Sequence, residues 1–122
     1  NKSEVFFKLK FILVLIMSNE YIVVLITVSS SDEAKDLSSG LVKEKLAYCV
    51  NQIPGVKSTY FWEGEICVDE EIQLLAKTVT HKLSELEKWI KVNHSYDTPE
   101  IIALPIVKGS ADYLKCVSDW CV

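Results

Sequence analysis

The strongest constraint on the fold is the eight-residue run YIVVLITV at 21–28, which consists almost entirely of β-branched and aliphatic side chains. The run is too short for a typical helix, and it lacks the strict alternation of a strand with one solvated face. A continuous apolar run of this length is typical of a strand that is buried on both faces. We therefore expect a buried strand over 21–28.

The next segments have the patterns of a helix and a β-hairpin. Ser30 and Glu33 have the spacing of a capping box and precede an apolar pattern of helical period, which predicts a helix over about 31–48 in which Gly40 permits close packing. A strand follows, and its glycines predict a bend or bulge at Pro54-Gly55 and a second bulge at Gly64. The acidic cluster at 69–71 is predicted to be the hairpin turn, and residues 72–79 are predicted to form the returning strand.

The last third of the chain predicts helix, strand and helix. Residues 80–94 have a helical apolar stripe, with Thr80 as a candidate cap. Residues 101–107 are expected to form a strand, and Pro105 places that strand at a sheet edge or bulge because proline cannot donate to the ladder. Ser110 is a candidate cap for a short terminal helix.

The resulting order is β-α-β-β-α-β plus a C-terminal helix, which predicts an α+β fold of the ferredoxin-like, split βαβ type. This fold places helices on one face of an antiparallel sheet and leaves the other face open. The aromatic hairpin arm at the edge of the sheet also needs a partner. Self-association into a closed ring would cover both surfaces.

Composition limits the classes of function. The 122 residues suit one domain, the net charge is −4, and all 13 cationic residues are lysine. Without arginine or a basic block, a nucleic-acid partner is not expected. Cysteines at 49, 67, 116 and 121 form no CxxC pair, so we expect reduced thiols in a cytoplasmic protein, without a structural zinc site.

The N-terminal residues 1–16 are expected to be an extension that precedes a single domain over 17–122. Lysines precede a short apolar run, which mimics a targeting segment, but polar residues follow it without a small-residue cleavage site. The run is too short for a stable membrane span. We therefore expect an upstream or artificial extension, and the targeting alternative stays open.

Cys49 and His94 are the most interesting candidates for soft metal ligands, since copper prefers thiolate and imidazole. Each follows a predicted helix and precedes a predicted strand. The competing interpretations are a buried small apolar residue for Cys49 and a cation at a helix C-terminus for His94. Spacing does not tell whether the two meet within a subunit or across an interface. Cys67, Cys116 and Cys121 are expected to serve packing.

Other polar and aromatic residues suit a ligand cleft as well as ordinary structure. Lys77 stands among apolar neighbours and faces either solvent or a bound anion. Tyr60 and Trp62 are interface or core aromatics that, with Glu63, also suit the wall of a cleft. Asp97 and Glu100 suit acid–base chemistry but equally a loop. No nucleophile–base–orienter set is visible, so we do not expect an enzyme.

Four stretches resemble the CutA divalent-cation tolerance proteins in order and spacing: LVKEKLAYCVNQIPGVKSTYFWEGEI, LLAKT, HSYDTPEIIALPI and DYLKCV. The resemblance covers about residues 20–121. It implies a ferredoxin-like homotrimer similar in architecture to PII signalling proteins. It also implies binding of copper(II) or another divalent cation, with no obligatory cofactor.

The resemblance also assigns positions. Cys49 matches the family cysteine, Trp62 and Glu63 match its Trp-Glu-Gly motif, and Lys77 matches a strand lysine. His94, Tyr96 and Glu100 match its histidine loop, in which Ser95 replaces a usual proline and Asp97 a usual glutamate.

We thus expect a trimer that binds divalent cations in metal ion tolerance and homeostasis, with Cys49 and His94 as ligands. The alternative is a PII-like signalling or scaffold trimer that binds a small anion or partner tail in inter-subunit clefts. The cleft residues would be Tyr60, Trp62, Glu63, Lys77, Tyr96, Asp97 and Glu100.

Overall fold

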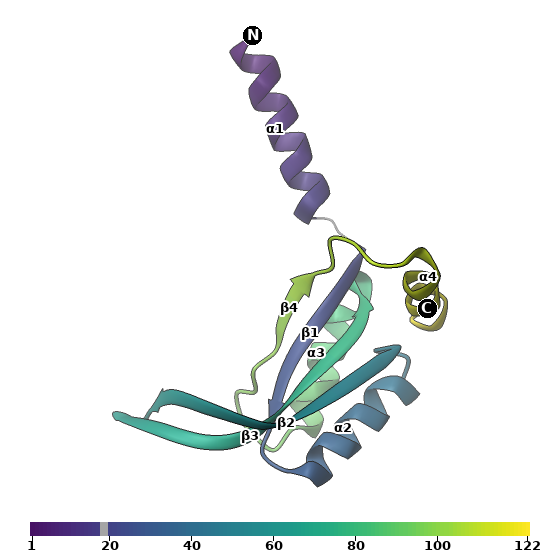
Figure 1. Ribbon diagram of the computed structural model, residues 1–122. Helices are drawn as coiled ribbons and strands as arrows, with labels where there is room; N and C mark the ends of the chain where they lie inside the picture. Colours follow the sequence, from purple (N-terminus) through teal and green to yellow (C-terminus); the bar gives the residue numbers. More distant parts are fainter. Residues whose placement is uncertain (18–19) are drawn as a thin grey trace.

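Four antiparallel strands form one sheet in the order β2-β3-β1-β4 in the computed structural model, which describes residues 1–17 and 20–122 (Figure 1). This is the strand order of the predicted ferredoxin-like fold, and the α+β class is confirmed. The elements are α1 (Lys2–Met17), β1 (Tyr21–Val28), α2 (Ser31–Lys43), β2 (Cys49–Trp62), β3 (Glu65–Val79), the 3-10 turn η1 (Thr80–Lys82), α3 (Leu83–Asn93), β4 (Ile102–Pro105) and α4 (Ala111–Trp120).

The strand β1 lies in the centre of the sheet, where its apolar run predicts it. It pairs along its whole length with β3, from Tyr21 opposite Val79 to Val28 opposite Ile72, and with β4 on its other side. Its side chains alternate: Ile22, Val24 and Ile26 are buried against α2 and α3. Val23 and Leu25 are only half-buried, so the expectation of complete burial on both faces is too strong.

The core lies between the sheet and the two central helices. Leu37 and Leu41 of α2 and Leu86 and Ile90 of α3 are almost fully buried in it. Gly40 of α2 faces Trp89 of α3, and a Cβ at position 40 would collide with the indole ring. The predicted close packing at Gly40 is thus confirmed, with Trp89 as the neighbour.

The opposite face of the sheet is open only in part, because α4 covers one end of it. Val117 of α4 and Cys121, the residue directly after it, pack against Val79, together with the partly buried Tyr48 and Trp120. A hydrogen bond from the Tyr21 hydroxyl to Ser118 Oγ (3.2 Å) holds the helix there. The rest of this face carries the half-buried Val23, Leu25, Leu75 and Lys77 and, on β4, the exposed Ile102 and Leu104.

The helix α2 ends at Lys43, earlier than the predicted residue 48. Lys45 adopts a left-handed backbone conformation (φ 59°), and the amides of Leu46 and Ala47 both bond the Leu41 carbonyl. The apolar residues after 43 therefore belong to a compact helix end. Periodicity alone does not reveal such an end, because Leu46 and Ala47 are still buried.

The hairpin turn is at Glu63-Gly64, and the predicted turn at 69–71 is wrong. Both turn residues have positive φ (49° and 81°), as a tight two-residue hairpin requires. Gly64 is therefore a turn residue and not a bulge. The acidic residues 69–71 lie within β3 and pair with 56–58 of β2, on an arm whose side chains are mostly solvated, so acidic residues do not interrupt it.

The other predicted features are present, although some helices and strands begin or end at different residues than predicted. The strand register slips between Ile53 and Val56, which confirms the bulge at Pro54-Gly55. Ser110 caps α4 by accepting from the Tyr113 amide, and Pro105 ends the edge strand β4. That strand is shorter than the predicted 101–107. Thr80 opens the 3-10 turn η1 instead of directly preceding α3.

The helix α1 was not expected as an ordered element. It extends away from the sheet in Figure 1, and the side chains of residues 1–10 are exposed. The predicted boundary between an extension over 1–16 and a domain over 17–122 stays a prediction. Among the described residues, no helix combines the length and apolar character that a bilayer span requires.

Candidate functional site

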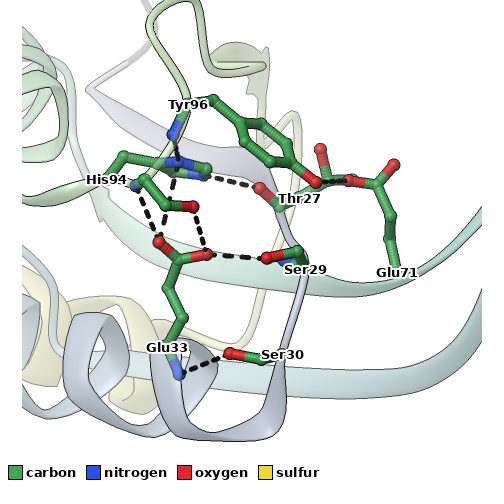
Figure 2. Close-up of polar contacts among 8 residues, drawn as sticks. Thr27, Ser29, Ser30, Glu33, Glu71, His94 and Tyr96 are labelled. Atoms are coloured by element: carbon green, nitrogen blue, oxygen red, sulfur yellow. Dashed lines mark hydrogen bonds and ion pairs between the residues drawn. The ribbon is translucent and has the colours of Figure 1, made fainter.

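His94, a predicted metal ligand, lies in the loop after α3 with both ring nitrogens occupied (Figure 2). Its Nε2 is 2.7 Å from the Thr27 carbonyl, which can only accept, so Nε2 must carry the proton. The Tyr96 amide donates to Nδ1 at 3.0 Å, so Nδ1 must be unprotonated. The imidazole is thus the neutral Nε2–H tautomer, and neither nitrogen is free for a cation in this arrangement.

Glu33 of α2 holds the same loop from the other side. Its carboxylate accepts from the Ser95 amide (2.7 Å), the Ser95 hydroxyl (3.1 Å) and the Ser29 amide (3.4 Å), while its own amide donates to Ser30 Oγ. Burial raises the pKa of Glu33, but the hydrogen bonds from Ser95 and Ser29 outweigh it, and the net pKa is lowered. The 3.9 Å between Glu33 Oε2 and His94 Nδ1 is a contact and not an ion pair, because the imidazole is neutral.

Tyr96 connects this loop to β3. Its hydroxyl donates to Glu71 Oε2 at 2.8 Å, and its ring lies 4.8 Å from the His94 ring, measured between centroids. Burial and the bond to Glu71 raise the pKa of Tyr96 to about 12. We call the set Thr27, Ser29, Glu33, Glu71, His94, Ser95 and Tyr96 the loop network.

The loop network fastens the loop to β1, α2 and β3. Its hydrogen bonds satisfy the buried imidazole and the buried Glu71, and they leave no open ligand position at His94. Such a network rigidifies a structure when every member has a partner. The ring nitrogens of His94, which the sequence suggested as metal ligands, therefore hold the loop in place within the chain.

Cys49 and Lys77 lie at the other end of the sheet. They are directly opposite each other in the β2–β3 register, and Lys77 is opposite Val23 of β1. Thr27, which contacts His94, lies four residues further along β1, or about 13 Å at the usual strand rise. Cys49 and His94 therefore do not meet within one chain. The Lys77 ammonium donates to Asn51 Oδ1 on the same face.

The aromatic candidates lie on the hairpin arm. Trp62 is the last residue of β2, Glu63 is in the turn, and Tyr60 donates its hydroxyl to Asp69 across the arm. That hydrogen bond, more than any other factor, raises the pKa of Tyr60 to about 12. Trp62 pairs with Glu65, twelve residues from Lys77 along β3, which corresponds to about 40 Å. One chain therefore does not gather Lys77 and Trp62 into a single cleft.

The remaining loop candidates are exposed. Asp97 and Glu100 both lie at the surface, and Glu100 accepts from Gln73 Nε2 at 3.4 Å. Within residues 1–17 and 20–122, no three or more His, Cys, Asp or Glu side chains come together as a metal site. The candidate residues therefore fall into three separate regions.

Sequence reasoning missed two residues that matter to these regions. Glu71 was assigned to a turn, although it is buried and holds Tyr96. Asn51, the partner of Lys77, carried no signal because a lone asparagine in a strand is uninformative. Glu33 was detected only as a capping residue, and its long-range bonds to Ser95 depend on tertiary structure.

Comparison with known proteins gives one consistent family. Residues 22–120 match the model of the CutA1 divalent ion tolerance protein family. The divalent-cation tolerance protein CutA of Thermus thermophilus is 48% identical over 98 residues, which cover 80% of this chain and 91% of that protein.

Two further relatives extend the comparison. The rice protein CutA 1, chloroplastic, is 46% identical over 94 residues, and the match covers 77% of this chain but only 53% of the rice protein. The solved structure of the periplasmic divalent cation tolerance protein CutA from Archaeoglobus fulgidus superposes with a TM-score of 0.81 at 35% identity, covering 84% of this chain and 99% of that chain.

Proposed function

Because the chain belongs to the CutA1 divalent ion tolerance protein family, we propose that it works as a homotrimer that binds copper-type divalent cations and contributes to metal ion tolerance. The family match over residues 22–120 carries this proposal. No catalytic activity is proposed.

Edge strands and exposed apolar side chains of the sheet support the proposed trimer. The strands β2 and β4 are both edge strands. The arm exposes large apolar side chains, among them Phe61, Trp62 and Ile66, at 69%, 58% and 71% of their surface. Exposed edges and apolar patches favour association. A closed ring of three copies would cover them, and it would bring the arm of one copy to the sheet of the next.

The oligomeric state is tested by sedimentation velocity. Three copies of 13.8 kDa predict a species of about 41 kDa. Ile66→Lys on the arm is expected to shift the mass toward the monomer. Val92→Lys is the matched control, because Val92 is an apolar residue of α3 that is 83% exposed and lies away from the sheet. A stable wild-type monomer would contradict the trimer.

Cys49 is the proposed cation ligand, since it is a half-exposed free thiol at the family position. His94 is proposed to position its loop and not to bind the cation, because both ring nitrogens bond the protein. Isothermal titration with Cu²⁺, and with Cd²⁺ as a redox-inert divalent probe, tests both roles. Cys49→Ser should weaken binding at least tenfold, whereas His94→Asn should lower stability and leave the stoichiometry unchanged. Absence of binding to wild type would refute cation binding.

The signalling alternative, in which Lys77, Tyr96 and Glu100 hold an anion, gains no support from the geometry of one chain. Tyr96 bonds Glu71, six residues from Lys77 on β3, or about 20 Å. The Glu71 carboxylate accepts from the Tyr96 hydroxyl, and its negative charge disfavours an anion there.

A cytoplasmic location stays a prediction. Named relatives include a chloroplastic and a periplasmic protein, so membership of the family does not fix the compartment.

A further inference from the structure

Four large apolar side chains project from the first half of α1. Val5, Phe6, Phe7 and Leu9 leave between 57% and 71% of their surface uncovered. The helix extends away from the sheet (Figure 1), and none of residues 1–10 belongs to a hydrophobic cluster of the domain. Exposed apolar side chains that lie together mark a surface that contacts a partner.

These side chains surround the helix and do not form one stripe. Successive residues of a helix point about 100° apart, so Val5, Phe6 and Phe7 face three different directions, and Leu9 lies between the directions of Val5 and Phe6. A helix that is apolar all round needs an apolar environment on every side. The domain does not supply that environment to residues 1–10, so it has to come from a partner.

The lysines of α1 give the partner a charge. Lys2, Lys8 and Lys10 are exposed among the apolar residues, and Glu4 is the one acidic residue of the segment. Three lysines and one glutamate give residues 1–17 a formal side-chain charge of +2, whereas the whole chain carries −4. The partner of α1 is therefore expected to be negatively charged at its surface and apolar within.

A lipid bilayer with anionic headgroups has both properties. Its acyl chains surround an inserted helix on all sides, and its negative surface attracts lysines. The long lysine side chain lets the ammonium group reach the headgroups while its stem stays among apolar groups. A second copy of α1 fits less well, because a seam between helices covers one stripe only and would bring equal positive charges together.

The length of α1 favours immersion in one leaflet over crossing the bilayer. Its 16 residues correspond to about 24 Å, whereas the hydrocarbon core is about 30 Å thick. No helix in the part of the chain that the structure describes is long and apolar enough for a span. The three lysines also have to stay near the headgroups, because a charged side chain at the centre of the bilayer is costly.

We propose that α1 binds an anionic lipid bilayer by immersing in one leaflet. Phe6, Phe7 and their apolar neighbours lie among the acyl chains, and the ammonium groups of Lys2, Lys8 and Lys10 lie at the anionic headgroups. The domain that follows is thereby held at the membrane surface. The inference goes beyond the proposed cation binding and does not depend on it.

The test is flotation of the full chain with lipid vesicles in metal-free buffer. One set of vesicles contains phosphatidylcholine alone, and the other contains phosphatidylcholine with phosphatidylglycerol. The chain should float with the mixed vesicles, and high salt should weaken this binding, because it screens the lysines. Equal binding to both sets of vesicles, or no binding to the mixed vesicles, would overturn the inference.

Paired lysine variants test the electrostatic contribution. Lys8→Gln with Lys10→Gln should weaken binding to the mixed vesicles at least tenfold, because each lysine near an anionic surface contributes about fivefold. Lys35→Gln with Lys88→Gln is the matched control, since these lysines are exposed on α2 and α3 and the change in net charge is the same. Equal effects of the two pairs would refute a specific role of α1.

Paired apolar variants test immersion and separate the bilayer from a second copy. Phe6→Ser with Phe7→Ser should weaken binding to the mixed vesicles at least tenfold. Val92→Ser with Val107→Ser should bind like wild type, since both valines are exposed apolar residues of the domain. Sedimentation velocity without lipid should give the same mass for the Phe6/Phe7 variant and wild type. A lower mass for the variant would show that copies of the chain cover α1, which would overturn the inference.

Hydrogen exchange gives a further measurement that needs no variant. The mixed vesicles should slow the exchange of the backbone amides of α1 and leave those of the hairpin arm unchanged. Slower exchange of the arm without any change in α1 would show that the arm contacts the lipid, and the inference would fall.

Discussion

Replacing Glu33 by glutamine tests how the loop network holds the loop after α3. The change keeps the shape of the side chain and removes its charge. The carboxylate now accepts three hydrogen bonds from Ser95 and Ser29. A glutamine that keeps its oxygen toward the Ser95 amide turns its NH₂ group toward the Ser29 amide, where two donors would face each other.

The magnitude follows from the number and environment of these bonds. The Glu33 side chain is only 13% exposed, so solvent replaces the lost interactions poorly. Hydrogen bonds to a charged group contribute about 1.5–3 kcal/mol each, and the glutamine loses at least one of them. We therefore expect Glu33→Gln to lower the free energy of unfolding by about 2 kcal/mol at neutral pH.

The assay is guanidinium unfolding at equal protein concentrations, because oligomerisation makes the apparent stability depend on concentration. Asp32→Asn is the matched control, since Asp32 is also acidic in the first turn of α2 but is exposed. That control should cost at most about 1 kcal/mol, the share of the helix dipole. Equal losses in the two variants would refute the role of the loop network.

The pH dependence of the same pair gives an independent check. The pKa of Glu33 is lowered in the folded state, so its contribution is present above the ordinary glutamate pKa and is lost as the pH falls through the lowered value. The stability difference between wild type and Glu33→Gln should therefore shrink in acid. A difference that stays constant down to pH 2 would contradict the carboxylate assignment.

Three further substitutions test particular contacts by the same unfolding assay. The pKa of Tyr96 is raised to about 12 by burial and by Glu71, so its contribution to the free energy of unfolding is full below about pH 10 and is lost as the pH rises from there through 12. Tyr96→Phe should therefore flatten the decline in stability over this pH range. An unchanged profile would argue against the bond to Glu71. Gly40→Ala should destabilise the protein by about 1–3 kcal/mol, because the new methyl group collides with Trp89 and this outweighs the better helix propensity of alanine. A gain in stability would show that the indole moves aside. Gly64→Ala should cost about 1 kcal/mol, because φ is +81° in the turn, and a neutral result would mean that the turn rearranges.

Local chemistry was enough to predict most elements of the fold. The apolar run at 21–28, the caps at Ser30 and Ser110, the bulge at Pro54-Gly55 and the edge position of Pro105 are all where the residues indicated. Each of these signals depends on a few adjacent side chains and the backbone they favour. For the same reason the order of elements predicted the ferredoxin-like sheet.

The wrong prediction of the hairpin turn concerns the arm, where polar residues are not a sign of a turn. Acidic residues 69–71 look like a turn, yet they continue a strand: Asp69 and Glu70 are exposed on the arm, and the buried Glu71 accepts a hydrogen bond from Tyr96. The observed turn requires positive φ at both Glu63 and Gly64. A single glycine in the sequence is only weak evidence for such a turn.

The sequence by itself determined the strand order, the core of the domain and the family, because periodicity and short motifs encode which side chains are buried together. Only the tertiary structure decided what the reactive side chains do. It turned His94 inward, where a carbonyl and an amide use both nitrogens, and it folded α4 over the start of β2, where the ring of Tyr113 meets the ring of Tyr48. The bond from His94 to the Thr27 carbonyl joins residues 67 positions apart in sequence, and no local pattern records such a contact.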